Sequence, residues 1–151
     1  MEIKTVKMRT VLFVDNDKIV LRSIERCLRD EPYHKLFAKS SKETLEILQQ
    51  KKVHVIVSDI LMPDIDGHEL LRIVGKMYSH IVKIVLSGYT DMPTLQAEYA
   101  QGEIFRFVPK PWIHNKDLIT AIRQAIDHYN LANKDESLVA GIEQCKTKFR
   151  E

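Results

Sequence analysis

The sequence predicts an α/β domain built on a doubly wound parallel sheet, and three observations support this fold class. Short apolar segments of strand length alternate five times with segments whose apolar residues recur at helical spacing. The strand segments lack the apolar–polar alternation of a sheet that exposes one face to water, so helices are expected on both faces. The repeated strand–helix order also favours parallel pairing of the strands.

Five strands are expected, and each ends close to polar or turn-forming residues. The third strand lies in VHVIVSDILMPDIDG, where the apolar run stops at Asp59. Asp, Ser, Gly and Pro after an apolar run are typical of a chain that turns at the end of a strand. The expected strands are residues 10–14, 33–38, the run from 53 up to Asp59, 81–86 and 104–108.

Five helices are expected after these strands. Ser40 and Glu43 have the spacing of a capping box, which predicts a helix start. Pro32 ends the first helix, and Pro93 suits the first turn of the fourth, expected over residues 91–101. The positions that define the other helical faces are Val20, Ile24 and Leu28; Leu45 and Leu48; Leu70, Ile73, Val74 and Met77; and Leu118, Ile122, Ala125, Ile126 and Tyr129.

The composition argues against several broad classes of function. Lys and Arg total 23 against 21 Asp and Glu, so no strong electrostatic field points to nucleic acid or to an anionic membrane. The longest apolar runs are far shorter than a membrane span. Cys27 and Cys145 have neither disulfide nor metal-site spacing, which is typical of a reducing compartment. We therefore expect a soluble cytoplasmic protein without a structural metal.

Four polar residues from different parts of the chain are expected at one edge of the sheet. Asp15, Asp59, Ser87 and Lys110 each stand just past the carboxyl end of a different predicted strand. Each has an ordinary explanation as a cap, a turn residue or a solvated charge. In open parallel α/β sheets, however, this edge is where ligands bind. Two acids, a hydroxyl and a lysine together can hold a divalent cation and a phosphoryl group.

These residues resemble the receiver domain of bacterial response regulators, the CheY-like phosphoacceptor module of two-component signalling. The resemblance covers roughly residues 9–129. It rests on four segments in order: Val14-Asp15-Asn16-Asp17, Ser58-Asp59 through Met62-Pro63 to Asp66-Gly67, Val85-Leu86-Ser87-Gly88, and Lys110-Pro111. It implies a flavodoxin-like fold with strand order 2-1-3-4-5. Pro109 fits that order, because the fifth strand would be an edge that tolerates a missing backbone donor.

The resemblance implies a phosphoryl acceptor and a metal ion. Asp59 would take a phosphoryl group from a sensor histidine kinase or a phosphotransfer protein, giving an aspartyl phosphate. Mg²⁺ would be held by Asp59, by the backbone carbonyl of Leu61 and by the acidic segment of Asp15 and Asn16. The domain would catalyse only its own phosphorylation and dephosphorylation.

The resemblance also implies a conformational switch. Lys110 would pair with Asp59 and then with a phosphoryl oxygen. Ser87 would swing inward to hydrogen-bond the phosphoryl group, and Phe107 would fill the space that Ser87 leaves. Phosphorylation would thereby shift the balance between two forms of the surface. For Phe107, core packing on the strand is the simpler alternative.

One departure from the family pattern leaves a second interpretation open. The family usually has adjacent carboxylates after the first strand, and Asn16 stands at the position of a direct metal ligand. An amide oxygen coordinates Mg²⁺ but brings no charge, so weaker metal binding is expected, which Asp17 would partly offset. The alternative is a degenerate receiver that keeps the fold as a docking module.

A third interpretation belongs to a different class of protein. Asp15, Ser87 and Lys110 also resemble motifs of haloacid-dehalogenase-like phosphatases, in which Asp15 would be the nucleophile and Asp17 the acid–base partner. That mechanism needs a further acidic pair after a strand that follows the lysine, and the sequence has none there. It also leaves the DILMPDIDG segment unexplained.

The chain divides into a receiver over residues 1–130 and a C-terminal extension over residues 131–151. In the extension, Leu138, Ile142, Cys145 and Phe149 recur at helical spacing, which indicates a helical linker or tail. The resemblance places the output surface on the fourth helix, fifth strand and fifth helix, residues 91–130. That surface and the extension would contact a second copy or an output domain. Residues 131–151 contain no DNA-binding motif, so we expect that this chain alone does not bind nucleic acid.

Overall fold

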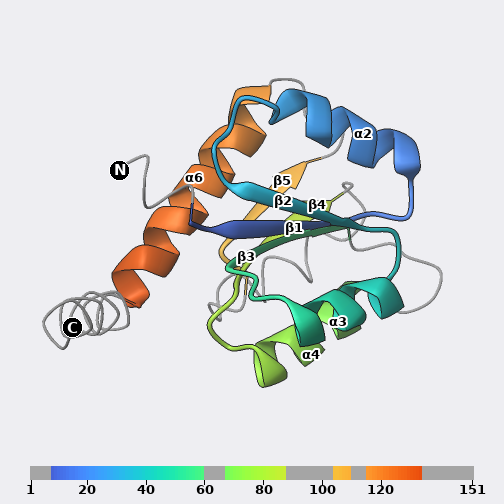
Figure 1. Ribbon diagram of the computed structural model, residues 1–151, viewed down its shortest axis with the longest axis vertical. Helices are drawn as coiled ribbons and strands as arrows, with labels where there is room; N and C mark the ends of the chain where they lie inside the picture. Colours follow the sequence, from blue (N-terminus) through green and yellow to red (C-terminus); the bar gives the residue numbers. More distant parts are fainter. Residues whose placement is uncertain (1–7, 60–66, 88–103, 110–114, 134–151) are drawn as a thin grey trace, which may run out of the picture.

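A computed structural model describes residues 8–59, 67–87, 104–109 and 115–133, and within them strands and helices alternate as expected (Figure 1). The elements are β1 (Thr10–Val14), α2 (Lys18–Cys27), β2 (His34–Ala38), α3 (Ser41–Gln50), β3 (Val55–Asp59), α4 (Gly67–Met77), β4 (Val82–Ser87), β5 (Arg106–Pro109) and α6 (Asn115–Ala132). The helix expected over residues 91–101 lies outside the described residues, so the number of five helices stays a prediction.

The five strands form one parallel sheet in the order β2-β1-β3-β4-β5, which confirms the predicted order. β1 has β2 on one side and β3 on the other, so the strand order reverses at β1. β5 is an edge strand and ends in Pro109, in register with Ser87 of β4. A proline is tolerated at such an edge because no further strand needs its missing N–H.

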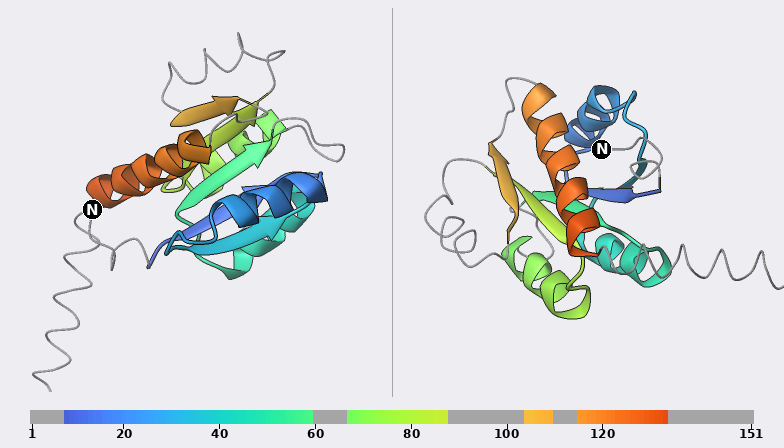
Figure 2. Two further views of the ribbon diagram at one scale, coloured as in Figure 1. Left: turned by 90° about the horizontal axis from the view of Figure 1, so that it is seen from above. Right: turned by 90° about the vertical axis from the view of Figure 1, so that its left-hand side faces the viewer.

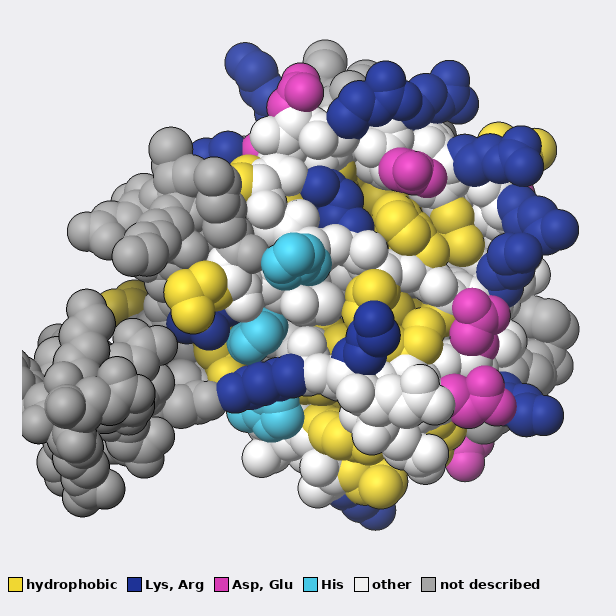
Figure 3. Space-filling model, in the orientation of Figure 1, with side chains coloured by type: hydrophobic (Ala, Val, Ile, Leu, Met, Phe, Trp, Pro, Cys, Tyr) yellow, Lys and Arg dark blue, Asp and Glu magenta, His cyan; other side chains and the backbone are white. Residues whose placement is uncertain are grey.

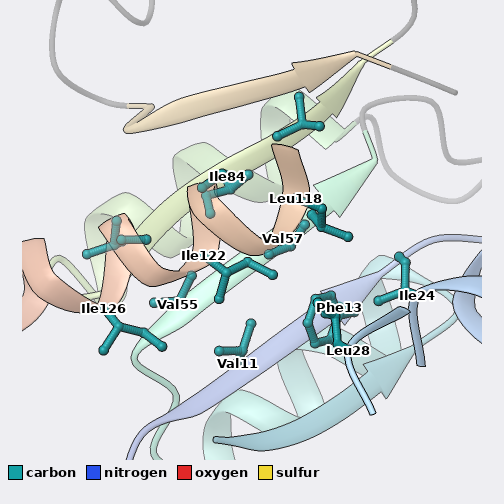
Figure 4. Packing of buried hydrophobic residues seen from close by; sticks show 14 of the residues in the cluster. Val11, Phe13, Ile24, Leu28, Val55, Val57, Ile84, Leu118, Ile122 and Ile126 are labelled. Carbon is teal, nitrogen blue, oxygen red and sulfur yellow. The ribbon is translucent and has the colours of Figure 1, made fainter. Parts of the chain in front are cut away.

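Helices cover both faces of the sheet: α2 and α6 lie on one face, and α3 and α4 on the other (Figures 1 and 2). Alternate residues of each strand enter opposite clusters. Val11 and Phe13 pack with α2 and α6, whereas Leu12 and Val14 pack on the α3–α4 side. Figure 4 shows the first cluster, in which residues of three strands meet Ile122 of α6. Burial on both faces explains why the strands are almost uniformly apolar.

Helix starts follow the predicted capping chemistry. Ser40 Oγ accepts the backbone N–H of Glu43 at 3.1 Å, which confirms Ser40 as the N-cap of α3. Glu43 reaches back to the N–H of Lys39, one residue before the N-cap, at 3.3 Å. In the same way, Asp17 caps α2 by accepting the N–H of Ile19 at 2.9 Å.

Some predicted boundaries differ by one or two residues. β4 spans Val82–Ser87 and β3 ends at Asp59, so both functional candidates are the last residues of their strands rather than the first residues after them. β5 starts two residues later than expected, although Phe105 N–H already donates to the Lys83 carbonyl at 2.8 Å. At the other end of the chain, α6 continues through Ala132. Among the described residues, no helix has the length and apolarity needed to cross a membrane.

Candidate functional site

Two acidic side chains lie next to each other at the carboxyl-terminal edge of the sheet. β1 and β3 are neighbours with Val14 opposite Ser58, so the next positions along this register are Asp15 and Asp59. Both side chains are withdrawn from solvent, with relative exposures of 1% for Asp15 and 8% for Asp59. This edge is also where the strand order reverses, which is the usual ligand site in a doubly wound sheet.

The three polar residues after β1, Asp15, Asn16 and Asp17, have different surroundings. The Asp15 carboxylate accepts the N–H of Asp17 at 2.9 Å, and the Asp15 N–H donates to the carbonyl of Ala38 at 3.1 Å. These bonds fix Asp15 at the edge of the sheet. Asn16 and Asp17 are exposed, and Asp17 uses one carboxylate oxygen to cap α2. Asp15 is therefore the inward member of the segment.

The end of β3 is held by its pairing with β4 and by the side chain of Ser58. Asp59 is in register with Leu86 of β4, and the Ser58 hydroxyl donates to the Asp59 carbonyl at 2.8 Å in a buried position. Asp59 continues the alternation of Val55 and Val57, whose side chains enter the cluster on the α2–α6 face. The backbone that carries the Asp59 carboxylate is thus fixed by sheet pairing and by its neighbour.

β4 and β5 bring two further candidates to the sheet. The backbone of Ser87 ends β4 and pairs with Pro109, and the backbone of Phe107 pairs with Val85. Ser87 therefore belongs to the same edge as Asp15 and Asp59. Lys110 and Leu61, together with the side chains of Ser87 and Phe107, lie outside what the structure describes, so their roles stay predictions.

The donors at this edge fit a hard divalent cation. Asp15 and Asp59 supply carboxylate oxygens and Asn16 an amide oxygen, the ligands that Mg²⁺ prefers in proteins. Two adjacent buried carboxylates favour a bound cation, because like charges repel and burial removes water that would stabilise them. Within the described ranges, no group of three or more His, Cys, Asp or Glu side chains is arranged to hold a metal. Mg²⁺ usually keeps several waters and binds proteins through one or two carboxylates, which Asp15 and Asp59 can supply.

Sequence reasoning assigned no role to Ser58. Its hydroxyl is fully buried and is bonded to the Asp59 carbonyl. The only signal was a serine at the end of the otherwise apolar run VIVS, where a buried hydroxyl needs a hydrogen-bond partner. Ser58 stabilises the strand end that presents Asp59.

Comparison with known proteins gives one consistent family. The model of the response regulator receiver domain matches residues 11–123. A hydrogenase transcriptional regulatory protein, HoxA of Cupriavidus necator, is 35% identical over 125 residues, which is 83% of this chain and 26% of HoxA. The sensor kinase CckA of Brucella abortus is 33% identical over 120 residues, covering 78% of this chain and 12% of CckA. The chain thus spans about a quarter of the first of these relatives and less of the second.

A solved structure agrees with this assignment. The receiver domain protein from Clostridium thermocellum superimposes with a TM-score of 0.75 at 28% identity, covering 83% of this chain and 99% of that protein. The fold, the paired acids at the strand-order reversal and the sequence matches all point to the same module. The chain belongs to the response regulator receiver domain family, the phosphorylation-dependent signalling switches of two-component systems.

Proposed function

We propose that the carboxylate of Asp59 accepts the phosphoryl group. Position carries this proposal: Asp59 ends a fully buried central strand and stands beside Asp15 at the strand-order reversal. An oxygen of Asp59 attacks phosphorus, the bond from phosphorus to the donor breaks, and the donor nitrogen or oxygen leaves with its electron pair. A phosphohistidine of a sensor kinase or of a phosphotransfer protein is the donor class we propose.

The acidic edge binds Mg²⁺ in this proposal. Asp15, Asp59 and the backbone carbonyl of Leu61 would hold the ion, and Asn16 would contribute a neutral oxygen. When bound, Mg²⁺ supplies the positive charge that phosphoryl transfer requires. Asp15 orients its carboxylate through its bond with the Asp17 N–H. The buried position of Asp59 limits competing hydrogen bonds from water.

Lys110 and Ser87 complete the site. The backbone of Ser87 pairs with Pro109 at the edge that holds Asp59, and Lys110 is the next residue in the sequence. We assign the Lys110 ammonium to a phosphoryl oxygen and the Ser87 hydroxyl to a second one. Phe107, two residues before Pro109, would move into the space vacated by Ser87. Differential contacts of this kind let phosphorylation shift a two-state surface.

The output of the switch is proposed at residues 91–130 and at the extension 131–151. HoxA is a transcriptional regulatory protein and CckA a sensor kinase, so receivers similar to this one occur beside different partners. This domain would act in the cytoplasm on a second copy or on an output domain. Nothing in the structure or in the comparisons favours a docking-only receiver or a phosphatase with Asp15 as nucleophile.

Intact mass after incubation with acetyl phosphate tests the proposal. The wild type should gain one phosphoryl group in the presence of Mg²⁺ and none when Mg²⁺ is chelated. Asp59→Asn should gain none, whereas Asp117→Asn, at an exposed acid in the first turn of α6, should match the wild type. No adduct on folded wild type, with a kinase-derived donor failing too, would instead favour a docking module.

A further inference from the structure

A cavity of about 680 Å³ opens at the amino-terminal edge of the sheet, opposite the acidic edge. Its lining comes from four places: the turn before β4, the start of β4, the residues that lead into β5 and the last turns of α6. The residues that matter most are His80, Lys83, Phe105, His128, Tyr129 and Asn133. Its size is within the range of about 300–1,000 Å³ that holds small ligands, and converging walls from several elements are typical of such sites.

Ring side chains form much of the wall. The rings of Phe105 and His128 have centroids 4.9 Å apart and are tilted by 35°, and those of His80 and Tyr129 lie 6.4 Å apart at 70°. Tyr129 is buried, and His54 packs edge-on against it at 4.9 Å, so the wall is supported from behind. Such surfaces favour a planar ligand, because rings stack on one another or meet edge to face.

The charge around the cavity is positive. Among the described residues that line it, Lys83 is the one with a formal charge, and none is Asp or Glu. The ring nitrogens of His80 and His128 add hydrogen-bonding groups. The guanidinium carbon of Arg106 lies 5.6 Å from the ring centroid of Phe105, and that of Arg9 lies 4.9 Å from the ring centroid of Tyr129. Figure 3 shows histidine side chains near this edge beside Lys and Arg side chains. The whole chain carries only +2, so this positive charge is local and favours an anion.

We propose that this cavity binds a small anion with a planar ring, the chemical class of a nucleotide. The base would stack on the rings of Phe105 and His128, and the phosphate would lie towards the basic side chains. An acidic peptide would meet the same charge, but the convergence of four elements on one compact cavity favours a single small molecule. Because Ala132 and Asn133 line the cavity, binding would also stabilise the last turn of α6.

Isothermal titration calorimetry with AMP and with GMP tests this site, with EDTA present so that the acidic edge takes no part. We expect a Kd below about 1 mM for at least one nucleotide, and inorganic phosphate alone should bind at least about tenfold more weakly. Removing a stacking ring should weaken nucleotide binding by about tenfold, the lower part of the range for loss of one base–aromatic contact. Phe105→Ala and His128→Ala are the variants.

His34→Ala is the matched control, because His34 is an exposed histidine on β2 that does not line the cavity. It should bind as the wild type does, and so should Asp59→Asn, which separates this site from the phosphoacceptor. If Phe105→Ala does not fold, the exposed His128 alone decides the result. The proposal is overturned by absence of binding at millimolar nucleotide, by equal binding of phosphate, by tighter binding of a Glu-rich peptide, or by equal losses in His128→Ala and His34→Ala.

Discussion

The two edges of the parallel sheet are chemical opposites. The carboxyl-terminal edge holds two buried acids, Asp15 and Asp59, on adjacent strands. The amino-terminal edge holds rings and cations near a cavity, and Tyr129 contacts both the imidazole of His54 and the guanidinium of Arg9. The first arrangement brings like charges together and favours a cation. The second arrangement is stabilised by ring packing and hydrogen bonds, and its positive charge favours an anion.

The difference between the two edges predicts which residues affect folding stability and which affect phosphorylation. Adjacent carboxylates contribute little to folding, because their repulsion and lost hydration oppose their hydrogen bonds. Packed rings with satisfied polar atoms contribute directly to the free energy of unfolding. We therefore expect substitutions at the carboxyl edge to change phosphorylation more than stability, and substitutions at the amino edge to do the reverse.

The largest effect is expected for Asp15→Asn. Loss of this charge should slow phosphorylation by acetyl phosphate by about 10²–10³-fold at fixed Mg²⁺, the usual cost of removing one group that stabilises charge in a transition state. The thermal midpoint should stay close to that of the wild type, because removing one of two adjacent acids relieves repulsion. Initial rates and thermal unfolding measure the two quantities. A lower thermal midpoint with an unchanged phosphorylation rate would contradict the proposed difference between the two edges.

His54→Ala should have the opposite effect: it should lower stability and leave the phosphorylation rate unchanged. The Nδ1 atom of His54 accepts the Thr10 N–H at 2.9 Å, and the side chain is buried against Tyr129. Deletion leaves a backbone donor unpaired and opens a cavity, so the free energy of unfolding should fall by about 2–4 kcal/mol. Urea unfolding measures this loss, and the exposed His80→Ala is the control. A difference of less than 0.5 kcal/mol (about the effect of ordinary surface substitutions) between the two variants would contradict the contrast.

Asp17 tests whether an acid at the carboxyl edge can serve mainly as a cap. Asp17→Ala should lower the free energy of unfolding by about 1 kcal/mol, because the Ile19 N–H loses its partner. Asp17→Ser keeps a capping oxygen without the charge and should restore that stability. Chemical unfolding of the three proteins decides the matter. If Asp17→Ser is as unstable as Asp17→Ala, charge at the helix start rather than capping is what stabilises α2.

The smallest effect at neutral pH is expected at Tyr33, which immediately precedes β2. Among the described residues its buried hydroxyl has no hydrogen-bond partner. Burial, and then the nearby charge of Glu31, raise the pKa of Tyr33 far above its usual value. Tyr33→Phe should therefore leave stability at pH 7 unchanged or raise it by up to about 1 kcal/mol, since a desolvated hydroxyl is removed.

The pH dependence follows from the same raised pKa. Below about pH 10 this tyrosine is protonated in both the folded and the unfolded chain. Above that pH the unfolded chain loses the proton while the folded chain keeps it, so stability falls as pH rises. Tyr33→Phe should reduce this alkaline loss, whereas Tyr78→Phe, at a half-buried tyrosine, serves as the comparison. Identical slopes from pH 9 to pH 11 (about one unit on either side of the unperturbed tyrosine pKa) in Tyr33→Phe and in the wild type would contradict this account.

The carboxyl edge was predictable from the sequence because its residues end, or directly follow, the strands that position them. Knowing that the strands are parallel is enough to bring Asp15 and Asp59 to one edge, and the register of β1 with β3 agrees. Capping at Ser40 was predictable for a similar reason, since both partners lie within one turn of α3. In both cases the spacing of nearby residues in the sequence is enough to make the prediction.

The amino edge was not predictable in this way. His80, Phe105 and His128 lie in three separate segments and meet only when β4, β5 and α6 pack together. The bond from Thr10 to His54 likewise joins residues 44 positions apart, and no periodic pattern marks either one. Contacts of this kind depend on side-chain packing across elements, which hydrophobic periodicity does not encode.

The central claim, that Asp59 carries the phosphoryl group, is tested most directly by locating the modified residue. Borohydride reduces an acyl phosphate of aspartate to homoserine, so peptide mass spectrometry after phosphorylation and reduction identifies the acceptor. We predict homoserine at position 59, dependent on Mg²⁺, with Asp15 unchanged. Homoserine at position 15, or at no position in a protein that has gained a phosphoryl group, would contradict the assignment.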